Sequence, residues 1–310
     1  MKTVSASAPG KFVVLGEHAV VFGKPAVALA IDRRFRCNVS ESDVFIVNGE
    51  EDDIDKHPHV KHILDIHGID AINLSSESNL PSGAGLGSSA ALCASLSCAV
   101  RHMLGKSLDS EEIMREAYAA EYYAQGIGSP MDVSVSVHGG GIGLNLPDAD
   151  ELLWTVENRG QKWDVCDIHA PEMTFVIGYT GKRALTGPLV EKVRRYRDRN
   201  RFAKDIVDEI GTVTLEGIGA LNTGNKTELG ELMTENHKLL SILGVSCPEL
   251  NRLVDAANEY SYGAKLTGAG GGGSMIALTD EPEKVSRSIL LHGGRPITVN
   301  TGVPGVKLEE

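Results

Sequence analysis

A run of glycines followed by two serines has the residue types needed to bind a phosphate. Gly83, Gly85 and Gly87 alternate with other residues and lead directly into Ser88 and Ser89. A helix is predicted to begin there, and a helix N-terminus stabilises an anion through its unpaired N–H groups and its dipole. Glycine lets the backbone approach a phosphate closely, and serine hydroxyls can reach a phosphate oxygen or a magnesium ion. The simpler alternative is that the glycines only turn a strand into a tightly packed helix.

Two familiar phosphate motifs fail a direct count. The only Gly-Lys-Ser, at residues 105–107, has Val100 where the Walker A pattern requires glycine. The dinucleotide pattern fails in the first glycine run because Ser88 stands at the position of its third glycine. The pattern matches formally within residues 268–273, but too little chain follows to build the usual nucleotide-binding unit. A nicotinamide-dependent enzyme is therefore not favoured.

Two other clusters of reactive or charged residues are better explained as surface features. Four histidines lie close together in the sequence, namely His57, His59, His62 and His67. We do not expect a metal site there, because no paired carboxylate or thiolate completes one nearby in the sequence. A dense basic run over residues 194–201 is interpreted as a solvated helix face, although one of its arginines could steer an anionic substrate.

Alternating and helical patterns predict the elements that must position these residues in the first half of the chain. Short β-rich runs at 11–15 and 43–47 predict strands, and residues 58–66 have the spacing of a helix. The helix after the glycine run is predicted over 90–104. A second helix is predicted from Asp109, which has a glutamate three residues later as in a capping box, to about residue 124.

The second half of the chain reads as a strand, several helices and a final strand–loop–strand group. Residues 133–137 alternate valine with serine, which predicts a half-buried strand. The polar stretch 148–171 is interpreted as a domain joint. A strand at 173–177 and helices between 186 and 260 follow. The last predicted elements are strands at 264–267 and 274–278, a helix at 282–292 and a strand at 296–299. The fold class is α+β in two domains.

Composition excludes several classes of protein. The chain has 310 residues and a formal net charge of −12, which argues against nucleic acid or an anionic membrane as its main partner. We expect no signal peptide, because the first residues lack an apolar stretch, and no apolar run in the sequence approaches membrane-spanning length. The five cysteines are an odd number without a Cys-x-x-Cys pair, so they are expected to be reduced thiols of a cytoplasmic protein.

Three segments in a fixed order resemble the signatures of the GHMP small-molecule kinases. The first is Pro9-Gly10-Lys11 with Gly16-Glu17-His18, and the last is Lys265-Leu266-Thr267 with the glycines that follow. The central segment consists of Pro81, Ser82, Gly83, Ala84, Gly85, Leu86, Gly87, Ser88 and Ser89. Within that superfamily, residues 16–23 and 128–132 are similar to the mevalonate kinases in a compact archaeal form.

The resemblance implies an architecture and a reaction. The expected fold is an N-terminal domain over residues 1–165, like the second domain of ribosomal protein S5, and a ferredoxin-like C-terminal domain over 166–310. The expected reaction is transfer of a phosphoryl group from ATP to the C5 hydroxyl of mevalonate, with Mg²⁺ as cofactor, in isoprenoid biosynthesis. A phosphomevalonate kinase, a mevalonate 3-kinase or a catalytically silent nucleotide-binding protein on the same fold are the alternatives.

The resemblance also assigns roles to individual residues. Asp132 is expected to accept the proton of the acceptor hydroxyl, with Lys11 beside it. Residues 81–89 are expected to hold ATP, and Glu121 with Ser88 or Ser89 to hold Mg²⁺. Glu17 and His18 are expected to contact mevalonate. A homodimer is also expected, since members of the family are often dimers.

Overall fold

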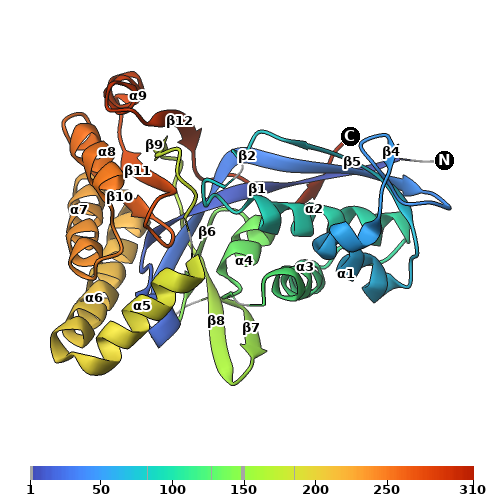
Figure 1. Cartoon of the computed structure of the whole chain (residues 1–310), viewed down its shortest axis with the longest axis horizontal. Helices are drawn as coiled ribbons and strands as arrows, with labels where there is room; N and C mark the ends of the chain where they lie inside the picture. Colours follow the sequence, from blue (N-terminus) through green and yellow to red (C-terminus); the bar gives the residue numbers. More distant parts are fainter. Residues whose placement is uncertain (1–2, 82, 127, 148–150, 185) are drawn as a thin grey trace.

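The chain folds around two sheets in an elongated molecule: the smaller sheet lies toward one end, and the larger one extends from beside it to the other end (Figure 1). The computed structural model describes residues 3–81, 83–126, 128–147, 151–184 and 186–310. In these residues nine strands form the first sheet and four the second. The first sheet contains β1 (Val4–Leu15), β2 (Ala26–Glu41), β3 (Ile46–Val47), β4 (Glu50–Glu51), β5 (Ile72–Ser78), β6 (Gly141–Leu144), β7 (Leu152–Asn158), β8 (Gln161–Ile168) and β13 (Lys307–Leu308). The second contains β9 (Thr174–Tyr179), β10 (Gly263–Thr267), β11 (Ser274–Leu278) and β12 (Arg295–Asn300).

The strands β1 and β2 pair along almost their whole length and are the two long strands of the first sheet. Residues 26–31 of β2 are fully covered, whereas its second half alternates between covered and open positions. The sequence patterns did not predict β2. It contains alanines, an aspartate and an asparagine, which are depleted in strands, so pairing with β1, β5 and β6 outweighs the local preference of these residues.

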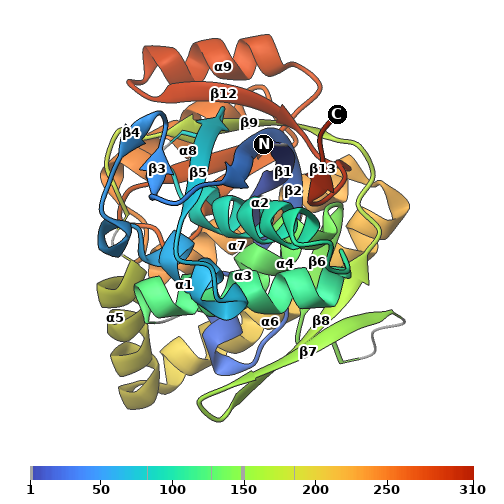
Figure 2. The same cartoon turned by 90° about the vertical axis from the view of Figure 1, so that its right-hand side faces the viewer.

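Four helices lie on one side of the first sheet (Figure 2). These are α1 (Pro58–His67), α2 (Ser88–Met103), α3 (Ser110–Gln125) and α4 (Met131–His138). The helices α2 and α4 pack on the strands of the sheet, and α1 and α3 pack on α2. The first three helices confirm the predicted ones. The Asp109 side chain accepts a hydrogen bond from the Glu112 N–H at the start of α3, as its capping pattern predicts. Most of α2 is buried, which explains its alanines, serines and cysteines.

The second sheet has the order β10-β11-β9-β12. The remaining helices are α5 (Thr186–Arg199), α6 (Arg201–Thr223), α7 (Lys226–Ile242), α8 (Pro248–Asn258) and α9 (Pro282–Leu291). Of these, α7, α8 and α9 pack on this sheet, α6 packs on α7 and on β1 and β2, and α5 packs on α6. All four strands of this sheet were predicted, and their registers are antiparallel throughout. No described helix combines the length and apolar character needed to cross a bilayer.

The predicted strand over residues 133–137 is wrong, because these residues lie within the helix α4. The alternation of valine and serine indicated a half-buried strand, but α4 is buried on nearly all sides. Ser134 and Ser136 are therefore as buried as the valines between them. The Ser134 hydroxyl accepts a hydrogen bond from Trp154 Nε1, which partners one of these polar groups inside the core.

The polar stretch 148–171 is not a joint in the described residues, since it contains the hairpin β7–β8 at the edge of the first sheet. The predicted boundary between residues 165 and 166 lies inside β8. The passage from the first sheet to the second falls between Ile168 and Thr174. At the other end of the chain, β13 returns to the first sheet and pairs with β1.

Candidate active site

A lysine from β1 and an aspartate from α4 meet beside the glycine run. Lys11 Nζ lies 2.9 Å from Asp132 Oδ2. The lysine side chain is buried, but 46% of the Asp132 side chain is exposed, so the carboxylate opens onto solvent. Asp132 also occupies the first turn of α4, where the helix dipole favours a negative charge. The structure thus brings together the two residues predicted to be catalytic.

The glycine run wraps around the same lysine. Lys11 Nζ donates a hydrogen bond to the Gly85 carbonyl oxygen at 3.3 Å, and the Lys11 N–H donates to the Leu86 carbonyl oxygen at 3.0 Å. Gly83, Gly85 and Gly87 all have positive φ, between 73° and 79°. A Cβ on Gly87 would lie 3.0 Å from Lys11 Cγ, so a side chain there would displace the lysine. The glycines are needed for this conformation and not merely for a turn.

Open space lies over Gly85, where an added Cβ would meet no atom within 4 Å. Beyond Gly87, Ser88 and Ser89 begin the helix α2 and are half-buried. Gly87 has no side chain with which to cap this helix, so its first N–H groups remain available for an anion. Ser82, which was also predicted to contact ATP, lies outside the described residues.

Gly85→Val is expected to weaken ATP binding at least about tenfold, measured by calorimetry. A branched side chain at φ 79° is strained and would fill the space over the loop. Gly105→Val is the matched control, because Gly105 also has positive φ and open space but ends α2 at the far side. Equal loss of ATP affinity in both variants, or none in folded Gly85→Val, would contradict the assignment of the loop.

Glu121 of α3 lies near this lysine and aspartate. It accepts a hydrogen bond from the Gln125 amide, which also donates to the Ser89 hydroxyl at 3.4 Å. Burial raises the pKa of Glu121, the Asp132 charge raises it further, and Lys11 acts in the opposite direction. Carboxylate and hydroxyl oxygens are the donors that Mg²⁺ prefers, and it is usually held by one or two carboxylates plus phosphate. The predicted donor set of Glu121 with Ser88 or Ser89 fits that ion.

Glu17 and His18 lie where β1 ends and are turned toward the second sheet. Glu17 forms a fully buried ion pair with Lys265 of β10. Burial raises the pKa of Glu17 and lowers that of Lys265, while their mutual attraction opposes both shifts. His18 Nε2 donates a hydrogen bond to the Ala269 carbonyl oxygen at 2.8 Å. These contacts tie the first sheet to the loop that follows β10.

Glu17 and His18 nevertheless each have one polar atom without a hydrogen-bond partner among the described residues. Among the described residues, neither Glu17 Oε2 nor His18 Nδ1 has a hydrogen-bond partner, although both atoms are buried. His18 is also held at φ 62°, a conformation that residues other than glycine rarely adopt. Buried polar atoms usually have partners, and strained backbone is concentrated at functional sites. Both observations leave room for a ligand at this end of the site.

The glycine-rich loop after β10 closes against both the strand β1 and the first glycine run. The Thr267 hydroxyl bonds to both the N–H and the carbonyl oxygen of Val13, so it holds the two sheets together. The Ser274 hydroxyl donates to the Ala84 carbonyl oxygen at 2.8 Å. Arg183, which follows β9, approaches from the same side: its Cγ would lie 3.9 Å from a Cβ on Gly83.

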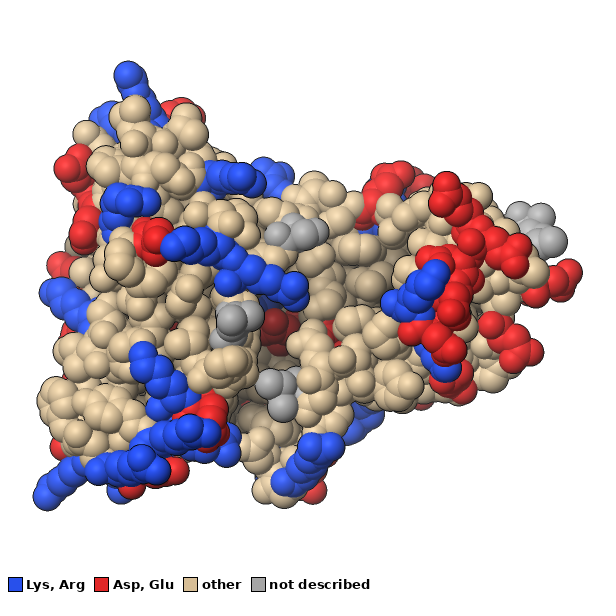
Figure 3. All heavy atoms as spheres, in the orientation of Figure 1, with Lys and Arg blue, Asp and Glu red and all other residues tan. Residues whose placement is uncertain are grey.

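The surface is hollowed between the two halves of the molecule (Figure 3). Carboxylate-bearing residues are visible at the bottom of this hollow, and lysine and arginine side chains extend along one of its rims. The basic rim can attract the phosphates of a nucleotide, and the carboxylates on the floor remain available to act on an acceptor.

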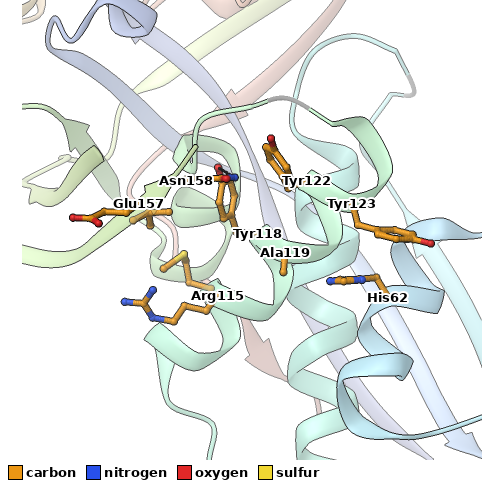
Figure 4. Close-up of a pocket in the computed structure, with 10 residues that line it drawn as sticks. His62, Arg115, Tyr118, Ala119, Tyr122, Tyr123, Glu157 and Asn158 are labelled. Carbon is orange, nitrogen blue, oxygen red and sulfur yellow. Dashed lines mark hydrogen bonds between the residues drawn. The ribbon is translucent and has the colours of Figure 1, made fainter. Parts of the chain in front are cut away.

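A separate pocket of about 410 Å³ lies between α3 and the hairpin β7–β8 (Figure 4). Its lining includes Tyr118, Tyr122 and Asn158, and the His62 ring stacks on Tyr123 with centroids 4.7 Å apart. None of the predicted site residues lines it. This pocket therefore lies apart from the charged cluster of Lys11 and Asp132.

Sequence patterns missed three residues that lie next to predicted site residues: Lys265 beside Glu17, and His59 and Cys93 beside Glu121. Lys265 was noted only as part of a motif, although a lysine inside a short apolar strand signals a buried partner. His59 and Cys93 lie close to Glu121, and the three residues come from three different helices. The interpretation of the histidine cluster as surface residues is therefore wrong for His59, which is partly buried and has a carboxylate and a thiol nearby.

Comparisons with known proteins show the family to which the chain and its fold are similar. Residues 57–140 match the profile described as GHMP kinases N terminal domain, and residues 218–290 match GHMP kinases C terminal. The mevalonate kinase of Pyrococcus abyssi is 34% identical, with 100% of this chain and 98% of that protein covered. The crystal structure of Methanococcus jannaschii mevalonate kinase is 28% identical with a TM-score of 0.81, covering 97% and 99% of the chains. That of L. major mevalonate kinase in complex with R-mevalonate has a TM-score of 0.82 at 23% identity, covering 95% and 94%.

Proposed function

The chain belongs to the mevalonate kinase family of the GHMP kinases, and we propose that it transfers the γ-phosphoryl group of ATP to the C5 hydroxyl of mevalonate. The product, 5-phosphomevalonate, is an intermediate of isoprenoid biosynthesis. The observation that carries this proposal is the contact between Lys11 and Asp132 beside the first glycine run. A base, a cation and a phosphate loop in one place are what transfer to an alcohol requires.

Asp132 accepts the proton of the attacking hydroxyl. Its carboxylate is open to solvent on one side and is held on the other by the buried ammonium group of Lys11. The same ammonium group stabilises negative charge on the transferring phosphoryl group. The loop of residues 81–89 and the first turn of α2 bind the phosphates through N–H groups. The lysine thus orients the base and neutralises charge at once.

Glu121, with Ser89 or Ser88, holds the magnesium ion. When bound, Mg²⁺ supplies positive charge that neutralises the phosphate oxygens. The Gln125 amide supports this assignment, because it bonds to both Glu121 and Ser89 and so holds the carboxylate beside the start of α2.

Glu121→Gln is expected to raise the Mg²⁺ concentration for half-maximal activity at least about tenfold, which corresponds to ~1.4 kcal/mol of lost binding free energy. The amide keeps the shape of the side chain but removes its charge. Activity should recover partly at high Mg²⁺. Glu112→Gln is a control on the same helix, since Glu112 pairs with Arg101 outside the site. An unchanged Mg²⁺ titration for Glu121→Gln would remove this residue from the metal site.

Glu17 and His18 form the acceptor end of the site. The free atoms Glu17 Oε2 and His18 Nδ1 support this role, because a bound polyol would supply their missing partners. Mevalonate offers a carboxylate and a tertiary hydroxyl for such contacts and leaves its primary hydroxyl for Asp132. The buried pair with Lys265 means that Glu17 also has a structural role.

A comparison of acceptors tests the proposed function. ADP formation is measured with ATP, Mg²⁺ and, in turn, mevalonate, 5-phosphomevalonate, galactose and homoserine. We expect kcat/KM for mevalonate to exceed that of each other acceptor by at least about 100-fold, since a site built to bind hydroxyls rejects ligands that leave its polar groups unpaired. Faster turnover of 5-phosphomevalonate would favour a phosphomevalonate kinase, and no turnover at all would favour a silent nucleotide-binding protein.

Three broader properties complete the proposal. We expect a homodimer that works in the cytoplasm without binding nucleic acid. The five cysteines are free thiols, which supports a reducing compartment. The net charge of −12 argues against a nucleic acid partner.

We divide the two domains between Ile168 and Thr174, where the chain leaves the first sheet, with β13 belonging to the first domain.

A further inference from the structure

Three helices place a histidine, a cysteine and a glutamate together next to the proposed magnesium site. His59 is the second residue of α1, Cys93 lies in α2 and Glu121 lies in α3. Their ligand atoms, an imidazole nitrogen, the thiol sulfur and a carboxylate oxygen, all lie within 4.8 Å of one another. These helices pack side by side under the first sheet (Figure 2), so the cluster is built on rigid elements.

The cluster has an open side and an unused donor. The Glu121 side chain is 14% exposed and that of His59 is 22% exposed, whereas Cys93 is fully buried behind them. His59 Nε2 lies 3.9 Å from Glu121 Oε2, too far for a hydrogen bond. Among the described residues this nitrogen has no hydrogen-bond partner, although it is buried. A buried nitrogen without a partner, facing a carboxylate and a thiol, indicates that a ligand belongs between them.

We propose that His59 Nε2, Cys93 Sγ and the Glu121 carboxylate form a second metal site that takes a borderline-soft divalent cation such as Zn²⁺. Nitrogen, sulfur and oxygen donors suit zinc, whereas Mg²⁺ takes oxygen donors. Zinc bond lengths place its ligand atoms about 3.5 Å apart, so the side chains close by about 1 Å on binding. The Cys93 thiol gives its proton to solvent as the Zn–S bond forms, and water fills the fourth position.

Occupation of this site inhibits the kinase, because Glu121 cannot serve both cations. This consequence rests on the proposed role of Glu121 in holding Mg²⁺, whereas the metal site itself does not. Zinc would therefore slow phosphoryl transfer by drawing the carboxylate toward Cys93 and away from the phosphates. The inhibition is reversible by a chelator, since no covalent change is involved.

Binding of Co²⁺ alone to the full chain tests the site, because a cobalt–thiolate bond gives a charge-transfer band that other donors do not. We expect the band in the wild type. Cys93→Ala should abolish the band. His59→Ala should weaken Co²⁺ binding more than about 100-fold, because a residue that only supports a ligand through a hydrogen bond costs at most about 100-fold in metal affinity when it is lost. Cys98→Ala, a buried cysteine on the same helix, should leave the band unchanged. A band that persists in Cys93→Ala, or no band in the wild type, would overturn the proposal.

Inhibition by Zn²⁺ separates the site from the proposed function. Turnover of mevalonate is measured with MgATP and rising Zn²⁺, with and without a chelator. Cys93→Ala should keep normal turnover and require at least about tenfold more Zn²⁺ for half-inhibition. Equal zinc sensitivity of the two proteins would contradict the shared role of Glu121. A wild type that gives the cobalt band but never phosphorylates mevalonate would refute the function and leave the metal site intact.

Discussion

Asp132→Asn is expected to lower kcat at least about 100-fold, within the range that a general base contributes, while ATP affinity changes little. The amide has the shape of the carboxylate but cannot take the proton of the acceptor hydroxyl. It also leaves the buried Lys11 ammonium group, 2.9 Å away, without its counter-charge. The loss should appear in single-turnover chemistry as well as at steady state, because the substitution acts on the transfer step.

Asp164→Asn is the matched control for this experiment. Asp164 is 41% exposed and lies 3.3 Å from Lys162, so its own exposure is close to that of Asp132, but its lysine partner is exposed and it lies on the β7–β8 hairpin. Its substitution should leave kcat unchanged. Near-normal kcat in Asp132→Asn would mean that this aspartate is structural and that the proton leaves by another route.

Lys265→Met is expected to lower the free energy of unfolding by about 3–5 kcal/mol, because it leaves the Glu17 carboxylate buried without its partner. The double substitution Lys265→Met with Glu17→Gln removes both charges and should recover much of that loss. The free energies are measured by urea unfolding for both single variants and the double variant. The resulting cycle isolates the coupling between the two residues.

The same variants separate the structural role of Glu17 from its proposed role at the acceptor. Glu17→Gln should be destabilised by the loss of the buried pair and should also raise KM for mevalonate, if Glu17 Oε2 bonds to the acceptor. A stability loss without any change in KM would leave Glu17 as a purely structural residue. If the double variant is no more stable than Lys265→Met, the ion pair does not account for the loss.

Local sequence patterns were sufficient where the physical cause is local. The Asp109 cap fixes the start of α3 through its bond to the Glu112 N–H. The alternating glycines at 83, 85 and 87 predict a loop with positive φ, and all three glycines have it. Lys11 and Asp132 were placed together by family resemblance alone, because neither pattern nor spacing relates residues so far apart.

Patterns failed where tertiary contacts decide the structure. The valines and serines of α4 alternate as in a strand, but a helix covered on nearly all sides has no polar face to reveal its period. Glu17 pairs with Lys265, 248 positions later in the sequence, and no local pattern connects them. The cluster of His59, Cys93 and Glu121 likewise exists only because three helices pack together.

The position of the new phosphate on mevalonate tests the central claim most directly. The purified product of the reaction with ATP and Mg²⁺ is examined by phosphorus NMR without proton decoupling. Phosphate on the C5 hydroxyl has two neighbouring C5 protons, so the account predicts a new ester signal split into a triplet. C3 carries no proton, so a singlet would place the phosphate on the tertiary hydroxyl and contradict the assignment of the acceptor site.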